Sequence, residues 1–121
     1  MIWPLARYVV HDTSMRPTLR PGDRVLVWRW TCVWGVRPGD VVVARDPELP
    51  GLHLIKRVAA VPGQAYAGLA GVDGYVLLGE DPATSRDSRT FGRVPVSLII
   101  GRAVYRYLPG ARRGLIDVEL G

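Results

Sequence analysis

The fold class is indicated by the stretch RPGDRVLVW at residues 20–28. Pro-Gly-Asp is a turn signal, and the run after it is rich in the β-branched and aromatic residues that favour strands. The combination recurs at residues 37–44, RPGDVVVA, which we attribute to shared turn chemistry rather than to an internal repeat. Further Val-rich runs occupy 52–58, 75–78 and 98–105. The sequence therefore predicts a mainly β fold, a small antiparallel β-barrel or coiled sheet with little helix.

The composition indicates one folded domain over residues 1–121. A chain of this length fits a single hydrophobic core. Its 48% hydrophobic and 22% charged residues exclude an intrinsically disordered protein. Cys32 is the only cysteine, so an internal disulfide is excluded, and no His/Cys spacing indicates zinc. We expect neither a metal nor another cofactor.

The net charge of +5 comes almost entirely from arginine, because Lys56 is the only lysine. The arginines are scattered, as on a solvated surface, and no base-reading motif accompanies them, so we expect no nucleic-acid partner. The basic segment from Arg102 to Arg113 leaves open a non-catalytic β-barrel that binds nucleic acid or lipid.

The first ten residues are apolar but contain Pro4 and Arg7. They fall short of the roughly 20 residues that span a bilayer. They also lack the charged start and cleavage site of a signal peptide. We therefore expect no transmembrane helix in this chain.

Ser14 is the first candidate for chemistry. It opens the segment Ser-Met-Arg-Pro-Thr-Leu at residues 14–19, in which Pro17 indicates a tight, non-repetitive backbone. Such a backbone can project a hydroxyl from the end of a strand. Taken alone, the segment also fits a serine that caps a short turn of helix.

Lys56 is the second candidate, within the predicted strand at 52–58. Alternate residues of a strand share a face, so Lys56 shares one with Leu54 and Val58. Burial on an apolar face disfavours the ammonium form and lowers the lysine pKa, which yields a neutral amine able to accept a serine proton. A surface lysine that keeps its amine in water is the alternative.

The third candidate is the polar loop at residues 78–95, LGEDPATSRDSRTFGRVP, followed by Gly-Arg-Ala at 101–103. Its hydroxyls, carboxylates and arginines fit a solvated turn by composition. Taken in order, however, the three stretches resemble the type I signal peptidases, endopeptidases with a Ser/Lys dyad. The resemblance covers residues 14–103 and implies the fold of that family, with this chain as a minimal catalytic domain.

The resemblance also implies site roles. Ser14 resembles the nucleophile and Lys56 its general base, while Ser85 resembles the serine that orients the lysine. Asp87 and Arg89 resemble an ion pair that holds the loop against the active site. The backbone N–H of Ser14 would contribute to the oxyanion hole.

The pocket for the small residue before the scissile bond is also implied by the resemblance. Met15, Leu19 and Ile55 fall where the family lines this pocket. The substrate would be a pre-protein or pro-protein with small residues before the cut, bound as an extended strand. The product would be a protein freed of its N-terminal signal or pro-peptide.

Two positions depart from the family pattern. Asp12 stands where serine or glycine is usual, two residues before the nucleophile. A carboxylate facing a developing oxyanion would repel it, so Asp12 must point away, be protonated or mark altered activity. Glu80 stands where aspartate is usual. The insertion before the last motif shrinks to about residues 64–74.

Other mechanisms are weaker on these residues. His11 or His53 with Asp12 or Asp87 would make a Ser-His-Asp arrangement, but neither histidine lies in a triad context. Cys32 lies in an apolar segment that does not favour a reactive thiol. Self-cleaving repressors use the same chemistry but carry a DNA-binding domain for which this chain has no room.

The short length also resembles the cytoplasmic maturation proteases of nickel-type superoxide dismutase, which leaves a second substrate and location open. Tryptophan favours membrane interfaces, so four tryptophans, together with an isoleucine near the N-terminus, indicate a peripheral membrane contact. These residues are Ile2, Trp3, Trp28, Trp30 and Trp34. Burial in the core or against a partner is the alternative.

Overall fold

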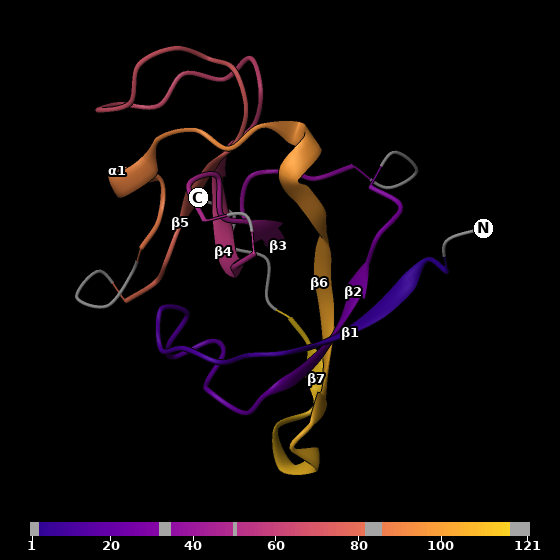
Figure 1. Ribbon diagram of the computed structural model, residues 1–121. Coiled ribbons are helices and arrows are strands. Elements are labelled where there is room, and N and C mark those ends of the chain that lie inside the picture. Colours follow the sequence, from indigo (N-terminus) through magenta and orange to yellow (C-terminus); the bar gives the residue numbers. More distant parts are fainter. Residues whose placement is uncertain (1–2, 32–34, 50, 82–85, 117–121) are drawn as a thin grey trace.

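The computed structural model describes residues 3–31, 35–49, 51–81 and 86–116, and its ribbon is drawn in Figure 1. One antiparallel sheet of seven strands dominates these residues. The strands are β1 (Leu5–Val9), β2 (Arg24–Trp28), β3 (Val41–Arg45), β4 (His53–Ala60), β5 (Val76–Leu78), β6 (Ile99–Leu108) and β7 (Gly114–Leu115). The helical elements are α1 (Ser88–Phe91) and two 3₁₀ turns, Val96–Leu98 and Gly110–Arg112.

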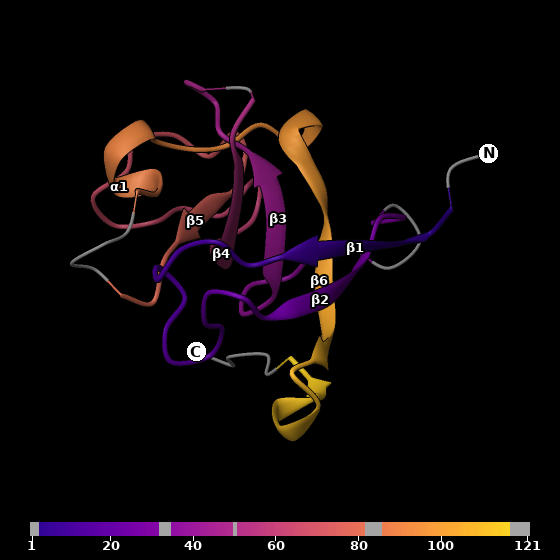
Figure 2. The ribbon, with the colours of Figure 1, turned by 60° about the horizontal axis from the view of Figure 1, so that its bottom comes forward.

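The strand order is β1-β2-β6-β3-β4-β5, with β7 added to β6. Every pairing is antiparallel, and β6 joins the two halves by pairing with both β2 and β3. The hydrogen-bonded path ends at β1 and β5, so the sheet is coiled but not closed. Figure 2 shows the resulting twist, with β1 and β2 crossing the direction of β3 and β6. The predicted mainly β fold with little helix is confirmed, in its open form.

The two Arg-Pro-Gly-Asp turns have the same local structure. In each, the aspartate carboxylate accepts from the backbone N–H of the arginine three residues earlier, at 2.9 Å for Arg20–Asp23 and 2.9 Å for Arg37–Asp40. The glycines have φ of 90° and 96°, a conformation that residues with a Cβ adopt at a cost. Turn chemistry thus explains the recurrence.

The core consists of two clusters on opposite faces of the sheet. β3 contributes to both: Val41 and Val43 belong to the first cluster, Val42 and Ala44 to the second. Because the sheet is covered on both faces here, the first four residues of β3 are all apolar and buried instead of alternating with polar residues, and only Arg45 at its end is exposed. The coiled sheet therefore places this strand at the centre of the molecule.

The alternative of a short turn of helix after Ser14 is not realised. The segment is a series of turns, with a single helical-type bond from Leu19 N–H to the Met15 carbonyl at 2.9 Å. The short helix α1 lies instead in the polar loop. Asp87 caps its start by accepting from Arg89 N–H at 3.0 Å, and the segment ends at Gly92.

Candidate active site

Ser14 lies in the irregular segment between β1 and β2, and it is only 1% exposed. Two backbone bonds close the base of this segment, from Val10 N–H to the Asp23 carbonyl and from Gly22 N–H to the Val10 carbonyl, each 2.8 Å. The Ser14 carbonyl accepts from Asp81 N–H at 2.8 Å. The serine is therefore held both from its own segment and from the polar loop.

Lys56 lies in the middle of β4, opposite Val42 of β3, and is 1% exposed. Its Nζ is 2.5 Å from Ser14 Oγ, with the amine as donor. Burial lowers the pKa of the Lys56 amine, and the nearby Arg89 lowers it further. Asp12, Asp87 and Asp46 oppose this shift without cancelling it. The predicted desolvated lysine is confirmed in its burial.

Asp12 points toward the serine and not away from it. Its Oδ1 accepts from Ser14 N–H at 3.1 Å and from Ser14 Oγ at 2.9 Å. The three side chains thus form a chain of hydrogen bonds from Lys56 through Ser14 to Asp12. Asp12 departs from the family pattern in sequence, but its contact with Ser14 was not predicted, because a residue two positions away can face in many directions.

Asp87 and Arg89 form the ion pair that the resemblance implied, with Nη2 to Oδ2 at 2.5 Å and Nε to Oδ1 at 3.0 Å. The pairing raises the pKa of the Arg89 guanidinium. The buried Asp87 also accepts from Gly79 N–H at 2.8 Å, which ties α1 to the end of β5. Ser85, the predicted orienting serine, lies outside the described residues.

A second network joins the serine segment to β4 and was not predicted. The buried Arg57 forms an ion pair with Glu80 and donates to the Gly39 carbonyl at 2.9 Å. Thr18 donates to the same glutamate at 2.6 Å. The available signal was an arginine next to Lys56 in an otherwise apolar strand, and a glutamate at a motif position.

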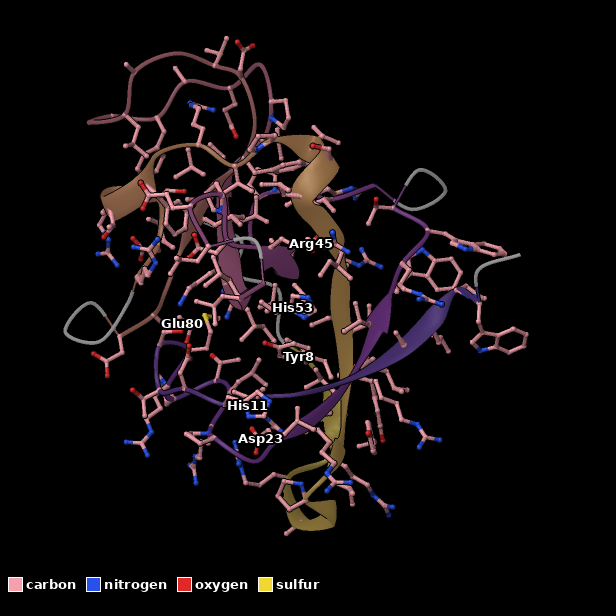
Figure 3. All side chains as sticks on the ribbon, in the orientation of Figure 1. Tyr8, His11, Asp23, Arg45, His53 and Glu80 are labelled. Carbon is pink, nitrogen blue, oxygen red and sulfur yellow. The ribbon has the colours of Figure 1, made fainter. Side chains whose placement is uncertain are left out.

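An open pocket of about 410 Å³ lies beside the site, between the end of β1 and the start of β4. Its lining includes Tyr8, His11, Asp12, His53 and Ile55. Figure 3 shows Tyr8 between the two histidines, and its ring centroid is 6.4 Å from each imidazole.

Of the three predicted pocket residues, only Ile55 lines this opening. Met15 and Leu19 are fully buried and belong, with Ile55, to the first core cluster. Their side chains pack the serine segment onto the first core cluster. Their predicted contact with a substrate stays a prediction.

The competing arrangements are not assembled around Ser14. Among the described residues, Ser14 Oγ hydrogen-bonds Lys56 and Asp12 and neither histidine. In that same part of the chain, no group of three or more His, Cys, Asp or Glu side chains is placed to hold a metal ion. Cys32 lies outside the described residues.

Comparison with known proteins identifies the class. The profile of the family described as "Signal peptidase, peptidase S26" matches residues 2–67. Subunit 2 of the mitochondrial inner membrane protease of Schizosaccharomyces pombe is 33% identical, covering 91% of this chain and 68% of its own length. The probable signal peptidase I-1 of Synechocystis is 32% identical, covering 89% and 73%. The Arabidopsis thaliana mitochondrial ATP-independent inner membrane protease subunit 1b is 36% identical, covering 82% and 68%.

The molecule is a serine-type endopeptidase with an open, coiled β fold. It belongs to the signal peptidase family, peptidase S26. The predicted resemblance to type I signal peptidases is thereby confirmed. Several of its relatives are named as proteases of a membrane. None of the helices in the described ranges is long and apolar enough to cross a bilayer.

Proposed function

We propose that Ser14 is the nucleophile and Lys56 the general base of peptide-bond hydrolysis. The observation that supports this assignment is the 2.5 Å contact between Lys56 Nζ and Ser14 Oγ, with both residues buried. A buried amine with a lowered pKa can be neutral at working pH and accept a proton.

The reaction proceeds through an acyl-enzyme. Neutral Lys56 removes the hydroxyl proton as Ser14 Oγ attacks the scissile carbonyl carbon, and the ammonium then protonates the departing amine. In the second half, water attacks the ester carbonyl while Lys56 takes one of its protons. The Lys56 ammonium then returns that proton to Ser14 Oγ as the acyl–oxygen bond breaks and the acid product leaves. The Ser14 N–H is the donor to the oxyanion in both halves.

The substrate lies extended along the free edge of β1. This strand is the end strand of the sheet, and the chain continues from it to Ser14. Tyr8 of β1 lines the pocket together with Asp12 and Ile55. An edge with unpaired backbone groups accepts an added strand, and the side chains on one face of that strand enter the pocket. Small residues before the cut fit a nucleophile this deeply buried.

The substrate class is a pre-protein or pro-protein whose N-terminal signal or pro-peptide is removed. The names of the relatives, signal peptidase and inner membrane protease, support this class. The one continuous sheet through the described residues supports a single minimal catalytic domain.

Peripheral membrane contact is part of the proposal. Trp3 is 72% exposed, Leu5 two residues later is also exposed, and Arg29 donates to the Trp3 carbonyl at 2.9 Å. An exposed tryptophan with an adjacent arginine suits an anionic membrane interface.

Trp3→Ala should reduce co-sedimentation with phosphatidylglycerol-containing vesicles, whereas the control Leu49→Ala, at an exposed leucine in another segment, should not. Equal co-sedimentation of both variants would contradict this contact.

Cleavage of defined peptides tests the dyad. The purified chain is incubated with an internally quenched peptide carrying Ala-Leu-Ala before the expected cut, and the products are identified by mass. Ser14→Ala and Lys56→Met should each abolish cleavage while their circular dichroism spectra stay those of the parent. Turnover of either variant within tenfold of the parent would remove that residue from the mechanism.

A further inference from the structure

The Asp12 carboxylate occupies both hydrogens of Ser14 that the proposed reaction needs. Oδ1 is 3.1 Å from Ser14 N, whose N–H would serve the oxyanion, and 2.9 Å from Ser14 Oγ, whose proton Lys56 would remove. A hydroxyl has a single hydrogen, so it cannot donate to Asp12 and to Lys56 at once. The hydrogen bonds therefore run from lysine to serine to aspartate, opposite to the direction of proton transfer.

The charge of Asp12 favours the same resting arrangement. Its carboxylate raises the pKa of the Lys56 amine, against the larger effect of burial, and so favours the ammonium that donates to Ser14. The carboxylate oxygen also fills the place beside Ser14 N–H where a substrate oxygen would bind. A substrate carbonyl gains this donor only after the carboxylate has left.

Asp12 has room to leave. Ser14 and Met15 are buried, but Asp12 is exposed and borders the open pocket with Tyr8 and His53. Rotation of its side chain therefore breaks two hydrogen bonds without opening a packed core. The same pocket lies along the edge where the substrate strand is proposed to bind, so substrate entry and Asp12 departure involve the same space.

We propose that Asp12 is a gate on Ser14: its carboxylate holds the resting site closed, and a bound substrate displaces it. This inference rests on the proposed roles of Ser14 and Lys56. Asp12 is a positioning residue, since it acts by directing the serine hydrogens and takes no part in bond making. The gate makes hydrolysis depend on a substrate that binds well enough to displace a charged acceptor.

Two measurements on four proteins test the gate. The parent, Asp12→Ser, Asp12→Asn and the control Asp73→Asn are compared, the control removing one carboxylate from an exposed turn. kcat/KM is measured with the quenched Ala-Leu-Ala peptide, and hydrogen exchange of the Ser14 amide is followed by NMR. A hydrogen bond to a charged group corresponds to roughly tenfold to a hundredfold in an equilibrium, so Asp12→Ser should raise kcat/KM by about tenfold. Asp12→Asn should give a smaller rise.

The exchange measurement needs no substrate and separates the gate from the dyad. Faster exchange of the Ser14 amide in both Asp12 variants, but not in Asp73→Asn, together with faster cleavage supports the gate. Unchanged exchange overturns it, and so does faster exchange with equal or lower kcat/KM. If Ser14→Ala or Lys56→Met still cleaves, the proposed dyad fails instead, whatever the exchange rates show about Asp12.

Discussion

Lys56 Nζ lies 2.5 Å from Ser14 Oγ although 42 sequence positions separate the two residues. The lysine comes from the centre of β4, which pairs with β3 and β5, and the serine comes from an irregular segment whose base is closed by backbone bonds. The pairing therefore depends on how the polar loop and Arg57 hold that segment against the sheet.

Lys56→Met should be inactive and at least as stable as the parent. Methionine keeps the buried stem and removes the amine, whose desolvation costs about 1.4 kcal/mol for each unit by which the pKa is depressed. Ser14 Oγ keeps its bond to Asp12 in this variant, so no polar group loses its last partner. Thermal melts at neutral pH check the stability, and a clearly lower Tm would indicate that the amine stabilises the fold.

Activity should rise with pH below the ordinary lysine pKa of 10.5, because burial lowers the Lys56 pKa and only the neutral amine is a base. In the same window the unfolded chain binds more protons at this lysine than the folded chain does. The parent should therefore gain stability relative to Lys56→Met as pH rises toward 10.5. Paired denaturant titrations at several pH values measure this difference. A constant difference between the two proteins would argue against a depressed pKa.

Asp87→Asn should lower the free energy of unfolding by about 2 kcal/mol, because a buried charged acceptor is lost from Arg89 and Gly79. Removing this carboxylate also removes a charge that raises the Lys56 pKa, so the pH profile of cleavage should shift to lower pH. Asp73→Asn, in an exposed turn, is the control and should leave both properties unchanged. A parent-like pH profile in Asp87→Asn would separate the ion pair from the active site.

Gly101→Ala should destabilise the protein by about 1 to 3 kcal/mol through overpacking. A Cβ at Gly101 of β6 would lie 2.5 Å from the Trp28 carbonyl oxygen and 2.7 Å from Val27 Cγ1 of β2. Gly51→Ala is the matched control, since a Cβ there meets nothing within 4 Å. Equal melting temperatures for the two variants would show that β2 and β6 can separate without loss.

Local sequence predicted the two Pro-Gly-Asp turns and five of the seven described strands, but neither β1 nor β7. Pro-Gly-Asp fixes a turn whose glycine needs positive φ, and Val-rich runs such as residues 41–45 favour the strands that they form here. The motifs around Ser14 and Lys56 also predicted the family, because residue types at fixed order mark the chemistry. These features depend on residues close together in the chain.

The tertiary structure alone decided how these parts meet. The order that brings β6 between β2 and β3, the ion pair of Arg57 with Glu80 and the buried bond between Lys56 and Ser14 join distant positions. Asp12 is close to Ser14 in sequence, yet its contact depends on the backbone direction of an irregular segment. The local sequence pattern determines the turns and most of the strands, because these depend on neighbouring residues. Packing of the whole sheet determines which distant side chains face one another and form hydrogen bonds.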